Sequence, residues 1–150
     1  MPTRTRIALT VVLVAVPAFV LGPILWPPAD IGVEPSAGQL AGFLLLAVGD
    51  ALLLGAGVAF LLHGRQLLLR LSPDSRRRAT TMYVAIAYLM VSWWPHLNMH
   101  TSNGTDLAGL LVIDLLFHLP LEVAAVTLSL CFFSLHRSRT ASGTTVAVDR

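Results

Sequence analysis

Four long apolar runs, separated by short polar segments, make up most of the chain. Each run approaches or exceeds the roughly 20 residues that a helix needs to cross a hydrocarbon core about 30 Å thick. A segment inside a bilayer must satisfy its own backbone hydrogen bonds, and no two-residue alternation indicates a barrel, so each run is expected to be helical. The predicted spans are residues 7–26, 39–62, 80–97 and 107–135.

Composition supports the same class of protein. Hydrophobic residues make up 55% of the 150 residues and charged residues only 12%, against about 25% charged in an ordinary soluble domain. We therefore expect an all-α integral membrane protein, with a single four-transmembrane-helix bundle over residues 1–135 and a disordered cytoplasmic tail over 136–150. The first run is longer than the core of a signal peptide, at most about 15 residues, and is taken as a retained helix.

The charge distribution predicts the orientation of this bundle. All ten basic residues are arginines, and in a four-span arrangement they fall on one side, whereas the loops of the other side carry only acids. The positive-inside rule then places both termini in the cytoplasm, N-in and C-in. The bilayer rather than nucleic acid is the expected partner, and the compact all-arginine plan resembles small multi-pass proteins of the bacterial plasma membrane.

Three adjacent arginines, Arg76, Arg77 and Arg78, lie at the end of the predicted inner connection, residues 63–79. A helix-start signal, Ser72-Pro73-Asp74-Ser75, precedes them. Such a basic run commonly serves only to fix topology, but it also suits an anionic lipid head group. The three arginines are the candidate lipid contacts at the inner leaflet.

Four ionisable residues inside the predicted spans are candidate ligand or proton-relay groups, because a buried charge is costly in a bilayer. Asp114, His118 and Glu122 have i, i+4, i+8 spacing and share one face, with Asp114 close enough to hydrogen-bond His118. Pro120 frees the backbone carbonyl of about residue 116 for another polar partner. Asp50 lies at the depth of His118 and could pair with it.

A metal site is predicted at the outer rim, where His96 and His100 have the i, i+4 spacing of a ligand pair. With the third span ending near residue 97, His96 should reach Asp114 but not His118, which lies about 10 Å deeper. The predicted ligands are therefore His96, His100 and Asp114, for a divalent ion such as zinc, copper, nickel or iron. The same depth difference argues against a haem held by His96 and His118.

No catalytic residue can be assigned from sequence motifs. His96-x-x-x-His100 resembles one fragment of the histidine boxes of membrane di-iron desaturases and hydroxylases, but those enzymes use several boxes and this chain has five histidines in all. The favoured function is a non-enzymatic bundle that packs with itself or with a partner subunit, using the small residues Ala47, Ala51 and Gly55. The alternatives are a metal or small polar ligand in an outward-facing His/Asp cavity, or a proton- or ion-conducting component.

Overall fold

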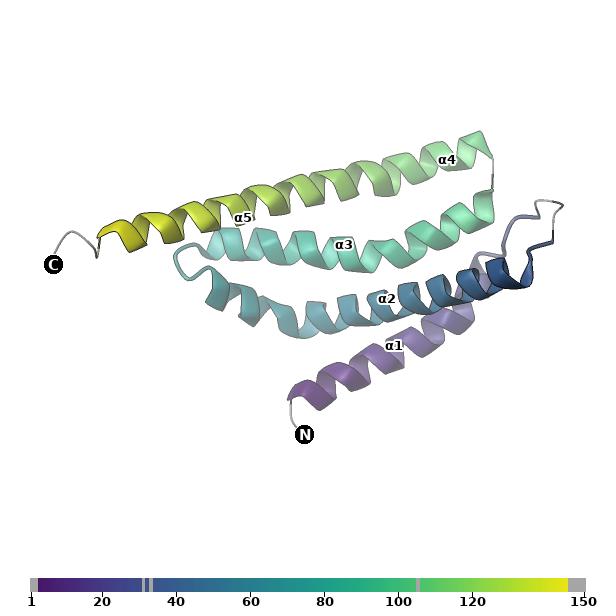
Figure 1. The fold of residues 1–150 in the computed structure, drawn as a ribbon, viewed down its shortest axis with the longest axis horizontal. Coiled ribbons are helices and arrows are strands. Elements are labelled where there is room, and N and C mark those ends of the chain that lie inside the picture. The colour runs from purple at the N-terminus through teal and green to yellow at the C-terminus, as the bar shows by residue number, and fades with distance from the viewer. Residues whose placement is uncertain (1–2, 31, 33, 105, 146–150) are drawn as a thin grey trace.

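In the computed structural model all regular secondary structure is helical among the residues it describes, 3–30, 32, 34–104 and 106–145. Figure 1 shows α1, α2, α3 and a last, nearly continuous rod running antiparallel to one another. α1 begins and α5 ends towards the end of the molecule where α2 turns into α3 (Figure 1). The elements are α1 (Thr3–Leu25), α2 (Ala37–Leu71), α3 (Arg76–Asn103), α4 (Leu107–Ile113), the π-helical η1 (Asp114–His118) and α5 (Leu119–Thr145).

Three of these helices are long and apolar enough to cross a membrane. They are α1, α2 and the rod formed by α4, η1 and α5, over Leu107–Ser138. α3 is also long, at 28 residues, but it includes the polar side chains of Tyr83, Tyr88 and Ser92 and is less apolar. The all-helical class is thus confirmed, and the three apolar helices indicate a multi-pass membrane protein.

The turn between α2 and α3 is much shorter than the predicted connection of residues 63–79. α2 continues to Leu71, and α3 begins at Arg76, where the hydroxyl of Ser75 accepts a hydrogen bond from the Arg78 backbone N–H at 3.2 Å. Both extensions are helical because they bury apolar side chains against each other: Leu68 of one and Ala79 of the other belong to one core cluster. Only residues 72–75 connect the two helices.

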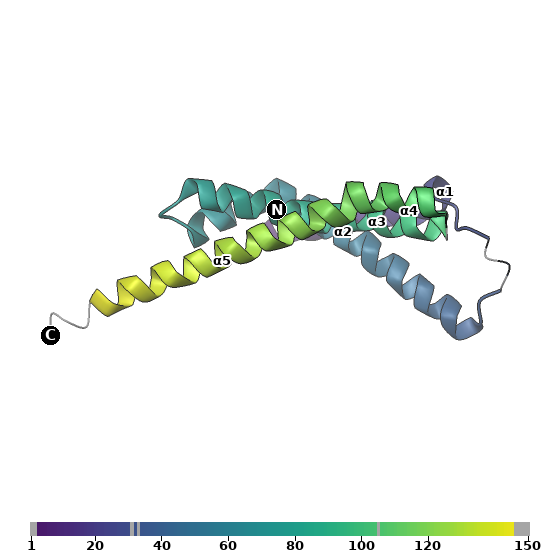
Figure 2. The ribbon, with the colours of Figure 1, turned by 90° about the horizontal axis from the view of Figure 1, so that it is seen from above.

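The C-terminal ends of α3 and α5 also lie beyond their predicted positions. α3 continues to Asn103, six residues past the expected end, and closes on Gly104, whose φ of 56° is one that glycine adopts easily. α5 continues to Thr145, ten residues past the predicted end of the last span at 135, and the remainder of the predicted tail, 146–150, lies outside the described residues. Seen from above, α5 diverges from α3 towards its C-terminal end (Figure 2).

Pro120 has the predicted effect on the backbone one turn earlier. The Leu116 carbonyl, four residues before the proline, accepts a hydrogen bond at 3.1 Å from the Tyr88 hydroxyl of α3. The π-helical turn η1 ends at His118, two residues before this proline, and such turns are frequent at functional sites. The prediction that a polar group satisfies this carbonyl is confirmed, and the contact ties α3 to the last rod beside His118.

Small residues bring α1 and α2 into close contact. Ala15 and Ala18 of α1 form a buried cluster with Ala51 of α2. One turn further, Gly55 is so close to α1 that a Cβ atom there would lie 2.4 Å from the Val11 carbonyl oxygen. The predicted small-residue surface therefore packs, at Ala51 and Gly55, against a helix of the same chain.

Candidate metal centre

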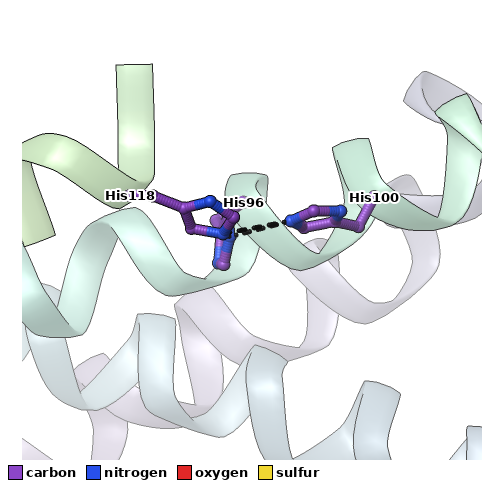
Figure 3. A group of neighbouring side chains, drawn as sticks. All are labelled: His96, His100 and His118. Atoms are coloured by element: carbon purple, nitrogen blue, oxygen red, sulfur yellow. Dashed lines mark hydrogen bonds between the residues drawn. The ribbon is translucent and has the colours of Figure 1, made fainter. Parts of the chain in front are cut away.

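Three histidines from two helices converge on one point (Figure 3). The Nε2 atom of His96 lies 2.8 Å from that of His118 and 3.1 Å from that of His100. The third side of the triangle, between His100 and His118, measures 3.3 Å. α3 supplies His96 and His100 one turn apart, and η1 supplies His118 as its last residue.

Hydrogen bonding alone cannot satisfy this triangle. A neutral imidazole nitrogen in the ring plane either donates one hydrogen or offers one lone pair, but not both. Among three mutually close nitrogens, at least one pair must therefore face lone pair to lone pair or hydrogen to hydrogen. A cation at the centre of the triangle removes the conflict, because it accepts all three lone pairs.

The spacing of the three nitrogens fits a single metal ion. Metal–nitrogen bonds of about 2.0–2.1 Å in a tetrahedral site place the ligand nitrogens about 3.3 Å apart. The longest side of the triangle already has this length, at 3.3 Å, and the shortest, at 2.8 Å, has to open by about half an ångström. Small side-chain rotations of His96 and His118 would achieve this without moving a helix.

Asp114 orients His118 from behind. The Nδ1 atom of His118 donates a hydrogen bond to the Asp114 carboxylate, one helical turn earlier, which leaves the Nε2 lone pair directed at the triangle. A carboxylate behind a ligand histidine fixes its tautomer and raises its basicity. The predicted contact between Asp114 and His118 is confirmed, and it is the only salt bridge found among the described residues.

Aromatic rings hold His96 in the interior of the site. The His96 side chain packs against Trp93 of its own helix and Phe117 of η1, with ring centroids 5.6 and 5.5 Å away. His96 is only 8% exposed, and its Nδ1 atom is buried without a protein partner. His100 and His118 are half-buried, so the triangle opens on the side away from His96.

Asp50 lies beside Trp93, one of the rings that pack against His96, and does not join the histidine cluster. This residue is buried, only 7% exposed, and its side chain lies close to that of Trp93. Glu122 is exposed and makes no side-chain hydrogen bond or ion pair among the described residues. Of the four candidate relay residues, Asp114 and His118 are in contact, and Asp50 and Glu122 stand apart from them.

The prediction that His96 cannot reach His118 is wrong. α3 ends at Asn103, which places His96 about 10 Å before the end of its helix instead of in the last turn. Helical side chains also lean towards the N-terminus of their helix, so His96 leans towards the start of α3 and His118, on a helix of opposite direction, leans the other way. The two imidazoles therefore meet between their backbone levels, and the cluster contains His118 where the sequence suggested Asp114.

The same contact changes the argument about haem. Two axial histidines must lie on opposite sides of the iron, with their nitrogens about 4 Å apart at metal–nitrogen bonds of about 2 Å. The depth difference no longer opposes such a pair, but the 2.8 Å between the His96 and His118 nitrogens and the presence of His100 at 3.1 Å suit a single ion better.

Comparison of the chain with protein-family models, with curated proteins and with solved structures finds no match. The function of the histidine cluster is therefore inferred from its own residues and their surroundings.

Proposed function

We propose that this protein is a four-span membrane protein, N-in and C-in, that binds one divalent transition-metal ion through His96, His100 and His118. The observation that carries the proposal is the convergence of three Nε2 atoms within 2.8–3.3 Å of one another. Three imidazoles suit zinc, copper, nickel, cobalt or iron and are poor ligands for calcium or magnesium.

The positions of the arginines support the proposed orientation. Arg76 begins α3 twenty residues before His96, and Arg137 follows His118 by nineteen, so each interval spans about 30 Å of helix. That length matches the hydrocarbon core. With the arginines at the cytoplasmic face, the histidine cluster lies near the outer face, within reach of ions from outside the cell.

Three protein ligands leave a coordination position open. No fourth histidine, cysteine or carboxylate joins the triangle among the residues described. Structural zinc sites are normally closed by four protein ligands, whereas sites with three keep a position for water or an incoming ligand. The half-buried edges of His100 and His118 give that position access from outside the bundle, so the site suits exchange of a small ligand.

The test is metal content per chain in detergent-purified protein. After dialysis against Zn²⁺ and then against metal-free buffer, elemental analysis should find about one zinc per chain in the parent. The double variant His96→Ala with His100→Ala should retain none, because only one imidazole remains. His63→Ala and His136→Ala serve as matched controls outside the cluster and should keep the parent stoichiometry.

Two results would contradict the proposal. One is a parent protein without bound metal while its circular dichroism shows a folded helical chain. The other is equal zinc content in the parent and the double variant, which would place the ion elsewhere.

Asp114→Asn should weaken zinc binding by about 10–100-fold without abolishing it. The amide can still accept a hydrogen bond from His118 Nδ1 but lacks the negative charge that would strengthen the imidazole as a metal ligand. Competition with a zinc-sensitive dye would measure the affinity. Glu122→Gln is the matched control on the same rod, and an equal loss in both variants would show that general charge, and not the contact with His118, is responsible.

A further inference from the structure

A second site lies at the opposite end of the molecule, where α3 begins and α5 passes beside it. A cavity of about 350 Å³ opens there, lined by residues of both helices that include Arg77, Arg78 and Ser134. Arg76, the remaining arginine of the run, does not line it. The three arginines that are adjacent in sequence are thus not equivalent in space.

Arg78 is held in place but its charge is not neutralised. Its Nε donates a hydrogen bond to the Ser72 hydroxyl at 2.8 Å, and its Nη1 donates to the Ser134 hydroxyl of α5 at 3.2 Å. The Nη2 atom is buried and has no protein partner. No carboxylate pairs with either Arg77 or Arg78 in the described part of the chain. A fixed guanidinium with unused donors next to a cavity is suited to a phosphate oxygen.

An apolar cavity of about 660 Å³ adjoins this cationic one. Thr81 of α3 and Thr127 of α5 line both, so the two are neighbours along the same interhelical groove. Beyond the threonines the walls are apolar and include Val84, Val123 and Leu119, which are more than half exposed. Along this pair of helices, α5 crosses α3 at an angle and leaves it towards the C-terminal end (Figure 2).

The length of the groove matches one leaflet of a bilayer. Ser75 lines its cationic end and Tyr88 its far end, thirteen residues or about 20 Å along α3. Half of the hydrocarbon core is about 15 Å thick, and the head-group layer adds several ångströms. The hydrogen bond from the Tyr88 hydroxyl to the Leu116 carbonyl bridges the two helices at this far end.

We propose that the α3–α5 groove binds one anionic phospholipid, with its phosphate on Arg77 and Arg78 and one acyl chain along Val84 and Val123. The groove is charged at one end and apolar along the rest, as a phospholipid has a charged head group followed by apolar acyl chains. The arginines select a negative head group. The proposal depends on the membrane placement proposed above, but not on the metal centre about 30 Å away along α3.

The test is native mass spectrometry of the full chain in a neutral detergent, titrated with phosphatidylglycerol or with phosphatidylcholine of the same acyl chains. The parent should retain one phosphatidylglycerol in clear preference to phosphatidylcholine. Arg78→Gln should weaken that binding by at least about tenfold, because charge-assisted hydrogen bonds are lost. Arg76→Gln, two residues away and outside the cavity, should change it by less than about threefold.

Val84→Trp separates the lipid from a free anion. An indole in the groove should block the acyl chain and weaken phosphatidylglycerol binding although both arginines remain. Inorganic phosphate should not compete with the lipid in the parent, and full displacement by phosphate would assign the cavity to a soluble anion and overturn the proposal. Dimers in lipid-free detergent that Val84→Trp dissociates would assign the groove to a second copy, also against it.

Arg77→Gln replaces Arg78→Gln if the latter does not fold, since Arg77 makes no side-chain hydrogen bond among the described residues. Equal binding of the two lipids, or equal losses in Arg76→Gln and Arg78→Gln, would overturn the proposal. Zinc content measured on the same samples should stay at the parent level, which keeps a failure here distinct from a failure of the metal site.

Discussion

Saturating Zn²⁺ should raise the melting temperature of this protein by about 10 °C, and His118→Ala should remove most of that rise. The ion would join α3, which carries His96 and His100, to the last rod, which carries His118. A ligand that binds only the folded state stabilises it by about 4 kcal/mol when present at a thousand times its dissociation constant. Without His118 the two remaining ligands lie on one helix, and the ion no longer connects the two helices.

Thermal unfolding in detergent, followed by circular dichroism with and without zinc, measures this effect. His136→Ala, at the far end of α5, is the matched control and should keep the full rise. Ca²⁺ at the same concentration should have no effect on the parent, since it prefers oxygen ligands. A full zinc-dependent rise in His118→Ala would refute the three-histidine centre, even if metal still binds to the protein.

Several features of the site could be predicted from the sequence because they depend only on helical periodicity. The i, i+4 spacing of Asp114 and His118 places both on one face, and the structure brings them into contact. The free carbonyl before Pro120 follows from the missing N–H of proline, and Tyr88 satisfies it. The spacing of His96 and His100 likewise puts both imidazoles on one side of α3.

The meeting of His96 and His118 could not be predicted, because it depends on helix ends and on side-chain direction. Counting depth from an assumed end at residue 97 shifted His96 by six residues, or about 9 Å, relative to the real end at Asn103. The extra residues, Asn98 to Asn103, are polar or weakly apolar, so no hydropathy criterion extends the helix through them. The two imidazoles also lean towards each other, and this removes the remaining difference in depth between His96 and His118.

Contacts distant in sequence leave no local signal at all. Arg78 and Ser134 are hydrogen-bonded although 56 residues separate them, and nothing in the arginine run distinguishes Arg78 from Arg76. The distinction arises from the angle at which α5 passes α3, a property of side-chain packing along both helices. For the same reason, composition indicated lipid contact but could not say which arginines face a cavity.

Gly55→Ala should destabilise the protein by about 1–3 kcal/mol, although alanine is the better helix former. The added Cβ atom would lie 2.4 Å from the Val11 carbonyl oxygen and 3.1 Å from the Val11 carbonyl carbon, and both are backbone atoms that cannot rotate away. α1 would have to move as a whole, which would open its packing against Ala51 and the Trp94 side chain. Chemical or thermal unfolding in detergent measures the loss.

Gly49→Ala on the same helix is the matched control, because nothing lies within 4 Å of a Cβ atom at Gly49. There the gain in helix propensity, up to about 1 kcal/mol, is unopposed and the variant should be as stable as the parent or more so. A loss of stability in Gly55→Ala together with a gain in Gly49→Ala would show that close helix–helix contact, and not helix propensity, determines the effect at Gly55. Equal effects at the two glycines would mean that α1 does not pack on α2 at Gly55. Zinc binding should survive Gly55→Ala in the folded fraction, since the histidines lie on α3 and η1.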